Sequence, residues 1–124
     1  FVAGIIMTTQ SLSMVDVYMG IGGAPDGFLA AAALQCIGGQ MQARLVINND
    51  DEKERATKIG FSDLIKKYHL NELASGDIIF SATGVTEGTM VKGIRKLNNH
   101  YVTHSLVLRT SDAPSQYIET HHLI

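Results

Sequence analysis

The sequence has little cysteine, no long apolar run and no excess of basic charge. Its single cysteine, Cys36, excludes a disulfide framework and a cysteine metal cluster, and it favours a reducing, cytoplasmic setting. No apolar run reaches the roughly 18 residues that a membrane span needs. Because the formal net charge is -2 at pH 7, no overall basic field attracts the chain to nucleic acid or anionic lipid. We therefore expect a cytoplasmic protein with neither a nucleic-acid nor a membrane partner.

The beginning of the chain resembles the interior of a protein. It starts at Phe1, and "FVAGIIMTT" has neither the basic region nor the small-residue cleavage site of a signal peptide. We therefore expect a fragment of a longer or nicked polypeptide. The 124 residues are enough for one compact core and too few for two ordinary domains.

The order of apolar segments predicts an α/β protein with a mixed sheet flanked by helices. Helices are expected at residues 1–13, 28–37, 48–60 and 61–70. Strands are expected at residues 15–21, 41–47, 78–83, 89–97, 101–110 and 115–124. The first two strands and the helix between them form a right-handed βαβ unit in this interpretation. The C-terminal strands follow short polar turns, so we expect them to be antiparallel.

The stretch "GIGGAPDGFLAAAALQCIGG", residues 20–39, resembles a phosphate-binding glycine loop followed by a buried helix. Two common versions of such a loop do not match. The dinucleotide-binding pattern fails because Pro25 stands where its third glycine belongs. The P-loop pattern fails because Phe28 and Leu29 replace its lysine and hydroxyl residue.

Asp26 lies in the first turn of the expected helix, next to Pro25, which suits that turn. A carboxylate in this place has two interpretations. It can compensate the helix dipole, which is worth about 0.3–1 kcal/mol. It can also be a hard oxygen ligand for Mg²⁺ or Mn²⁺ beside a bound phosphate. The local pattern leaves both interpretations open.

Three stretches together resemble one protein family. "GIGGAPDGFLAAAALQCIGGQMQARL", "LASGDIIFSATGVTEG" and "SLVLRT" are similar, in the same order, to stretches of the class II fructose-1,6-bisphosphatases. These are bacterial metal-dependent sugar phosphatases, some of which also hydrolyse sedoheptulose 1,7-bisphosphate. The resemblance implies that residues 1–124 are the C-terminal half of a layered sandwich similar to that of inositol monophosphatases. The N-terminal metal-binding part, which includes a D-G-D substrate motif, would lie outside this chain.

The resemblance also implies roles for two residues. The family has a metal-binding glutamate in the motif G-G-A-P-E-G, and Asp26, one methylene shorter, takes its place here. We therefore expect Asp26 to bind Mn²⁺ or Mg²⁺. The second glycine of the motif contacts substrate in the family, which implies a substrate-binding role for Gly23. No residue of this chain corresponds to a catalytic one, so we expect the chain alone to be inactive.

The function implied is hydrolysis of the 1-phosphate of fructose 1,6-bisphosphate to fructose 6-phosphate and phosphate, in gluconeogenesis. The partners implied are the upstream half of the same enzyme and further copies in a homo-oligomer. One alternative is a related inositol or sedoheptulose phosphatase. Another is a non-catalytic domain that binds phosphosugars or serves assembly.

The loop "SATGVTEG" is a weaker candidate site. Thr83, Gly84 and Thr86 can bond a phosphate, but we favour a turn in which the hydroxyl groups bond the local backbone. We expect Glu87 to be a solvated loop acid, and Cys36 to be a small core residue. The basic residues 92, 95 and 96 are most simply a solvated surface.

The histidine spacing predicts no zinc site. His121 and His122 are adjacent in an expected strand, so their side chains point to opposite faces. His100 and His104 are four residues apart, which places them about 13 Å apart in a strand. Neither pair can chelate one metal ion in these elements.

Overall fold

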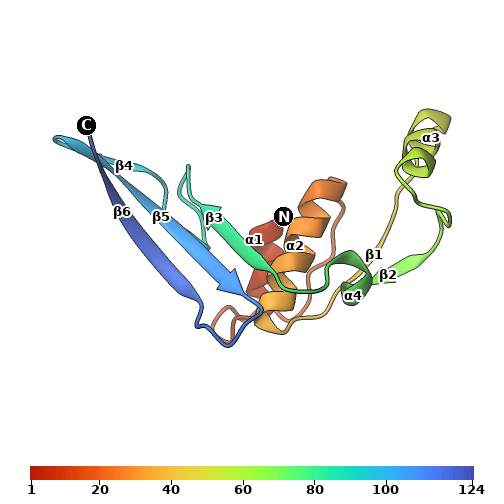
Figure 1. Ribbon diagram of the computed structural model, residues 1–124, viewed down its shortest axis with the longest axis horizontal. Coiled ribbons are helices and arrows are strands. Elements are labelled where there is room, and N and C mark those ends of the chain that lie inside the picture. Colours follow the sequence, from red (N-terminus) through yellow and green to blue (C-terminus); the bar gives the residue numbers. More distant parts are fainter.

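The computed structural model describes residues 1–124 and shows an elongated α/β molecule (Figure 1). The helices are α1 (Val2–Met7), α2 (Ala24–Ile37), α3 (Asp50–Lys58) and α4 (Leu70–Leu73). The strands are β1 (Gln42–Arg44), β2 (Lys67–His69), β3 (Ile79–Thr83), β4 (Arg95–Leu97), β5 (His100–Arg109) and β6 (Gln116–Leu123). Strands β3 to β6 form a sheet that α1 and α2 cover near one end. The small β1–β2 sheet and α3 extend away on the other side of these helices.

Strand β5 is the centre of the larger sheet. It pairs with β6 over residues 100–107 on one edge. Because that edge is occupied, β3 and β4 share the other edge, β3 beside residues 105–109 and β4 beside residues 100–102. All of these pairings are antiparallel, as expected for the C-terminal strands.

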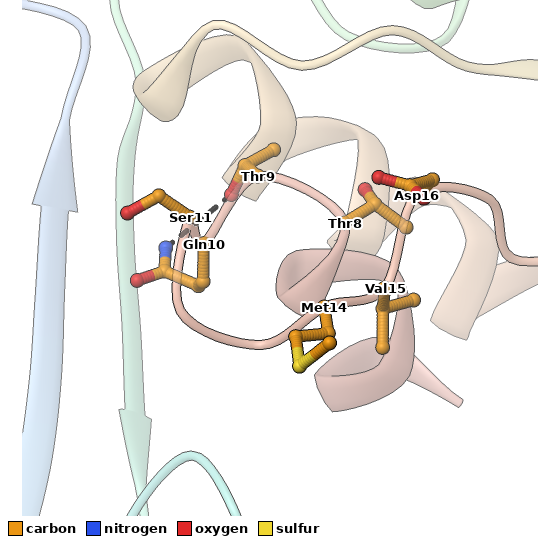
Figure 2. A pocket seen from close by; sticks show the side chains of 7 residues that line it. All are labelled: Thr8, Thr9, Gln10, Ser11, Met14, Val15 and Asp16. Carbon is orange, nitrogen blue, oxygen red and sulfur yellow. Dashed lines mark hydrogen bonds between the residues drawn. The ribbon is translucent and has the colours of Figure 1, made fainter.

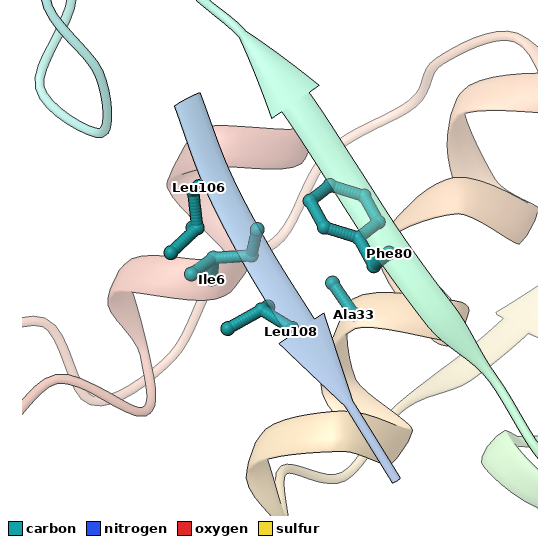
Figure 3. Packing of buried hydrophobic residues seen from close by; sticks show 5 residues of the cluster. All are labelled: Ile6, Ala33, Phe80, Leu106 and Leu108. Carbon is teal, nitrogen blue, oxygen red and sulfur yellow. The ribbon is translucent and has the colours of Figure 1, made fainter. Parts of the chain in front are cut away.

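The core lies where one face of this sheet meets the two N-terminal helices (Figure 3). Leu106 and Leu108 alternate with outward residues along β5, and Phe80 lies directly opposite Leu108 on β3. Ile6 of α1 and Ala33 of α2 complete the cluster. The small Ala33 side chain allows α2 to approach the sheet closely, so the alanine-rich sequence of this helix serves packing.

Helix α2 confirms the expected helix and its end. It starts at Ala24, four residues earlier than expected, and ends before Gly38, which has the left-handed conformation at φ 83°. Its buried positions are Ala30, Ala31, Ala33 and Leu34. The helix is not buried all round, because Phe28 is 41% exposed and Leu29 is 51% exposed.

Helix α3 also confirms its expected signals. The Asn49 side chain accepts a hydrogen bond from the Glu52 N–H at 2.8 Å, which caps the helix. The Glu52 carboxylate accepts the Asn48 N–H in return. The charge-dense stretch before and within α3 is therefore a solvated helix start.

The expected parallel βαβ unit is wrong, although the α/β class with a sheet flanked by helices is confirmed. Residues 15–21 form no strand, and β1 pairs with β2 in antiparallel fashion. No parallel pairing occurs, so the sheet is not mixed. The alternating pattern of residues 15–21 signals extended backbone, but a strand also needs a hydrogen-bonding neighbour, which these residues lack.

The expected helix at residues 61–70 is also wrong. Lys67–His69 form β2, and the helix α4 starts only at Leu70. The Phe61 and Tyr68 rings pack edge to face at 5.7 Å, which bends this segment back on itself. His69 then begins α4 in a capping box with Glu72.

Much apolar side-chain surface is exposed. The accessible area is 8730 Å², whereas a compact monomer of 13.4 kDa exposes about 6,500 Å². The most exposed large apolar side chains include Leu12, Met14, Met19 and Ile21, each more than 80% exposed. No helix combines the length and apolar character required to cross a membrane.

Gly84 gives a test of the packing around β3. A Cβ atom there would lie 2.0 Å from the Lys92 carbonyl oxygen. Gly84→Ala should therefore destabilise the fold by about 3 kcal/mol or more, since backbone has to move. Gly27→Ala is the matched control, because a Cβ there meets nothing within 4 Å and Ala favours the helix. Denaturant unfolding measures both variants, and equal midpoints would refute the contact.

Candidate functional site

The glycine loop leads into the N-terminus of α2. Gly23 is the N-cap residue, with φ -62° and ψ 146°, and its carbonyl accepts the Gly27 N–H at 3.1 Å. Because Pro25 has no N–H, the N–H groups of Ala24 and Asp26 are the free donors of this first turn. They lie at the positive end of the helix dipole, which favours an anion there.

The structure brings the two predicted site residues together. The Asp26 Oδ2 atom lies 3.7 Å from the position that a Cβ atom on Gly23 would take. Both residues are exposed. Asp26 belongs to none of the ion pairs. Its carboxylate is thus available to a ligand from solvent.

Two aromatic rings hold the loop in place. The Phe1 ring lies 2.8 Å from the position of a Cβ on Gly22, and the Tyr18 ring lies 3.1 Å from that on Gly20. The two rings pack edge to face with centroids 5.8 Å apart. Gly20 and Gly22 therefore serve close packing, which the sequence pattern alone did not reveal.

Asp26 fits one position in the coordination shell of Mg²⁺ or Mn²⁺. Both ions prefer carboxylate oxygen, and Asp26 offers an unpaired one. No group of three or more His, Cys, Asp or Glu side chains gathers in the structure. An octahedral ion bound here would take its other ligands from water, substrate or other protein groups.

The expected turn, in which hydroxyl groups bond the local backbone, is not formed in the loop after β3. The Thr83 hydroxyl bonds the Ser105 hydroxyl at 2.7 Å across the strands. Glu87 accepts the Gly93 N–H at 2.9 Å, so it closes the loop and is more than a solvated acid. Gly84 is buried beneath this loop. Thr83, Gly84 and Glu87 are therefore engaged in contacts within the protein.

A small polar pocket lies at the other end of α2 (Figure 2). It has a volume of about 120 Å³ and is lined by Thr8, Thr9, Gln10, Ser11, Met14, Val15 and Asp16. Thr9 lies against Gly39, which follows the C-terminus of α2. The pocket is thus separated from Asp26 by the length of the helix, about 21 Å, and neither predicted site residue lines it.

The histidines near each other in sequence do not meet, as expected. His104 stacks on Tyr117 and accepts the Lys92 N–H. His122 bonds Thr103, while His121 lies on the other face of β6. Register places His121 beside His100 instead, a cross-strand pairing that the sequence spacing did not show.

Two of the basic residues and the cysteine contact other side chains of the protein. Arg95 pairs with Glu119, and the Lys96 ammonium lies over the Tyr101 ring. Cys36 packs against the core cluster, as expected, and burial raises the pKa of its thiol. A thiol in this environment stays protonated and makes a poor nucleophile.

Comparison with known proteins identifies the class. Residues 2–122 match the family model described as bacterial fructose-1,6-bisphosphatase, glpX-encoded. This covers nearly the whole chain. The chain therefore belongs to the bacterial class of fructose-1,6-bisphosphatases, and the resemblance found in the sequence is confirmed.

Individual relatives carry a more particular name. Proteins of Trichodesmium erythraeum and Microcystis aeruginosa, each called D-fructose 1,6-bisphosphatase class 2/sedoheptulose 1,7-bisphosphatase, are 33% and 32% identical over 88% and 98% of this chain. A protein of *Acaryochloris marina* with the same name, numbered 2, is 35% identical over 88% of it. The matched part is 35–39% of each relative. This chain thus spans little more than a third of the curated relatives it matches.

Cys36 provides a test of its partly buried environment. At pH 8 its thiol should react with an aromatic disulfide reagent at least tenfold more slowly in the native protein than in denaturant, by an order-of-magnitude estimate, because burial lowers its thiolate fraction and access. The release of coloured thiol measures both rates. Equal rates would contradict the packing of Cys36 against the core.

Proposed function

We propose that the protein containing this chain hydrolyses the 1-phosphate of fructose 1,6-bisphosphate, giving fructose 6-phosphate and phosphate in gluconeogenesis. The observation that carries the proposal is the placement of Asp26 and Gly23 at the open N-terminus of α2. Membership of the fructose-1,6-bisphosphatase family supports it. The chain supplies one part of the site, and we expect it to be inactive alone.

Gly23 provides room for the sugar phosphate. Its backbone is exposed and carries no side chain, so an anionic oxygen can approach the free N–H groups of the following turn. These donors are fixed by the helix and require no rearrangement when the phosphate arrives. The role of this turn is therefore to bind and orient substrate.

Asp26 makes the same turn selective for a phosphate accompanied by a cation. Its carboxylate lies close to Gly23, so a bare phosphate at the loop would meet like charge. A divalent cation between the two anions removes that repulsion. This charge arrangement favours the metal-ligand interpretation of Asp26 over simple dipole compensation.

Mn²⁺ or Mg²⁺ is the cofactor that we propose. When bound, such ions neutralise the phosphoryl oxygens and promote ionisation of the attacking water. Asp26 would be one oxygen ligand, and its short side chain would hold the ion near the helix start. No residue of this chain is proposed to take or donate a proton in the reaction.

Sedoheptulose 1,7-bisphosphate is the second candidate substrate. The names of three relatives include sedoheptulose 1,7-bisphosphatase. Both substrates present a phosphate on a terminal sugar carbon, and the loop contacts that both would make are the same. Relative turnover of the two bisphosphates by the full-length protein separates them.

We also propose a cellular setting and binding partners for this chain. Its exposed apolar side chains would be covered by the upstream half of the same polypeptide, and further copies would form a homo-oligomer. Burying such surface is favourable by about 25 cal/mol for each Å². The single cysteine fits a cytoplasmic setting.

Asp26→Asn should abolish most phosphatase activity in the full-length protein. The change keeps the shape of the side chain and removes the charge that holds the cation, so turnover with Mn²⁺ should fall at least about a hundredfold, or about 3 kcal/mol. Phosphate release from fructose 1,6-bisphosphate measures it. Asp26→Glu should retain activity, because it restores the family's residue.

Asp51→Asn is the matched control for this prediction. Asp51 is another exposed acid in the first turn of a helix, α3, where it meets the same dipole. Loss of turnover only at Asp26 supports a metal ligand. Turnover unchanged at both positions would show that Asp26 only compensates the helix dipole.

Gly23→Ala should raise KM without lowering stability. The backbone at Gly23 is allowed for alanine, and the added Cβ meets no atom closer than 3.7 Å. It would occupy space that the phosphate needs, and we expect KM to rise about tenfold, or 1.4 kcal/mol of binding. Steady-state kinetics measure it, with Gly27→Ala as the control inside the helix. An unchanged KM would remove Gly23 from the substrate site.

A further inference from the structure

Two histidine rings meet across β5 and β6 at the end of the sheet remote from α1 and α2, near the C-terminus (Figure 1). The His100 Nε2 and His121 Nδ1 atoms lie 3.0 Å apart. The rings have centroids 5.0 Å apart and are tilted by 32°. The ring centroids are farther apart than these two nitrogens, so the two nitrogens lie on the facing sides of the rings.

The outer nitrogen of each ring faces an oxygen acceptor. The His121 Nε2 atom lies 3.3 Å from a Glu119 carboxylate oxygen, and the His100 Nδ1 atom lies 2.9 Å from the Asn99 side-chain oxygen. In the neutral imidazole tautomers that satisfy both oxygen acceptors, each outer nitrogen carries its ring's proton. In those tautomers both inner nitrogens present lone pairs to each other. Their 3.0 Å contact is a hydrogen bond when one ring takes the other tautomer or is protonated, and a bound metal ion is the other way to satisfy both nitrogens.

The geometry of the inner nitrogens suits a transition-metal ion. Two imidazole nitrogens bound at about 2.1 Å, with an angle of about 90–110° at the metal, lie about 3.0–3.4 Å apart. The separation of 3.0 Å falls in this range. Imidazole favours Zn²⁺, Ni²⁺ and Cu²⁺, whereas Mg²⁺ prefers oxygen ligands, so such a site is chemically distinct from the one proposed at Asp26.

The groups around the pair support the ligand role of His121. Glu119 accepts from His121 and also pairs with Arg95 of β4. A carboxylate behind a histidine fixes the tautomer and raises the basicity of the metal-facing nitrogen. Val102, buried on the same sheet face, lies opposite both Arg95 and His121.

We propose that His100 and His121 form a two-histidine site for Zn²⁺ or a similar imidazole-binding divalent ion, with Glu119 as the positioning residue behind His121. Water completes the coordination, since His121 is half exposed and no third protein ligand gathers there. The ion links β6 to the central strand β5. This link matters because every residue of β6 is exposed.

Calorimetric titration with Zn²⁺ tests the site on the full-length protein, with Mg²⁺ present in excess to occupy oxygen-ligand sites. His100→Gln and His121→Gln should each weaken one zinc-binding event at least tenfold. Glu119→Gln should weaken it about 10–100-fold. His122→Gln is the matched control, because His122 lies on the opposite face of the same strand, and it should leave the affinity unchanged.

Nitrogen chemical shifts of ¹⁵N-labelled histidine provide a second measurement on the unaltered protein. Zinc should shift the His100 Nε2 and His121 Nδ1 signals and leave the His122 signals in place. Absence of zinc binding, equal loss in the His122 variant, or shifts spread over all histidines would overturn the proposal. Neither measurement uses phosphatase activity, so its outcome is independent of the proposed function.

Discussion

The packing of one face of β5 against α1 and α2 is the interaction on which the rest of the structure depends. Leu106 and Leu108 supply the sheet side of this contact, and Ile6 and Ala33 supply the helix side. The same strand provides the backbone partners for β3, β4 and β6. A change in its register by one residue would turn its apolar face to solvent and separate sheet from helices.

The candidate site inherits its position from this contact. Helix α2 packs on the sheet through its middle, at Ala33 and its buried neighbours, so its N-terminus extends free and carries Gly23 and Asp26 with it. The Phe1 and Tyr18 rings then fix the glycine loop from the side of α1. A rigid helix end with open N–H groups and a nearby carboxylate is a suitable half-site for a phosphate with its cation. The fold thus places Gly23 and Asp26 together at an exposed helix end.

The inner face of the larger sheet changes from mainly apolar to mainly polar along its length. Near the helices its inner face is apolar, at Phe80 and Leu106. At the far end the same face carries Arg95, His100 and His121. Arg95 and His121 both bond Glu119, and His121 also bonds His100, so these contacts link β4, β5 and β6. Helices α1 and α2 do not reach this end of the sheet (Figure 1), where Val102 is the buried apolar residue of the face. Polar side chains suit an open sheet end because they stay hydrated there, although each exposed cross-strand contact adds only about 0.2–1 kcal/mol.

The sequence by itself determined the local features of this protein. It specified α2 and its Gly38 end, the Asn49 cap of α3, the C-terminal antiparallel strands and the glycine loop with Asp26, because capping, turn and alternation signals act between residues close in the chain. The tertiary structure decided which segments pair. Residues 15–21 have the alternation of a strand and no partner, residues 67–69 have a partner despite a helix-like sequence, and His121 meets His100 rather than His122. Pairing depends on register and on packing between distant segments, and the spacing of neighbouring residues does not determine either of them.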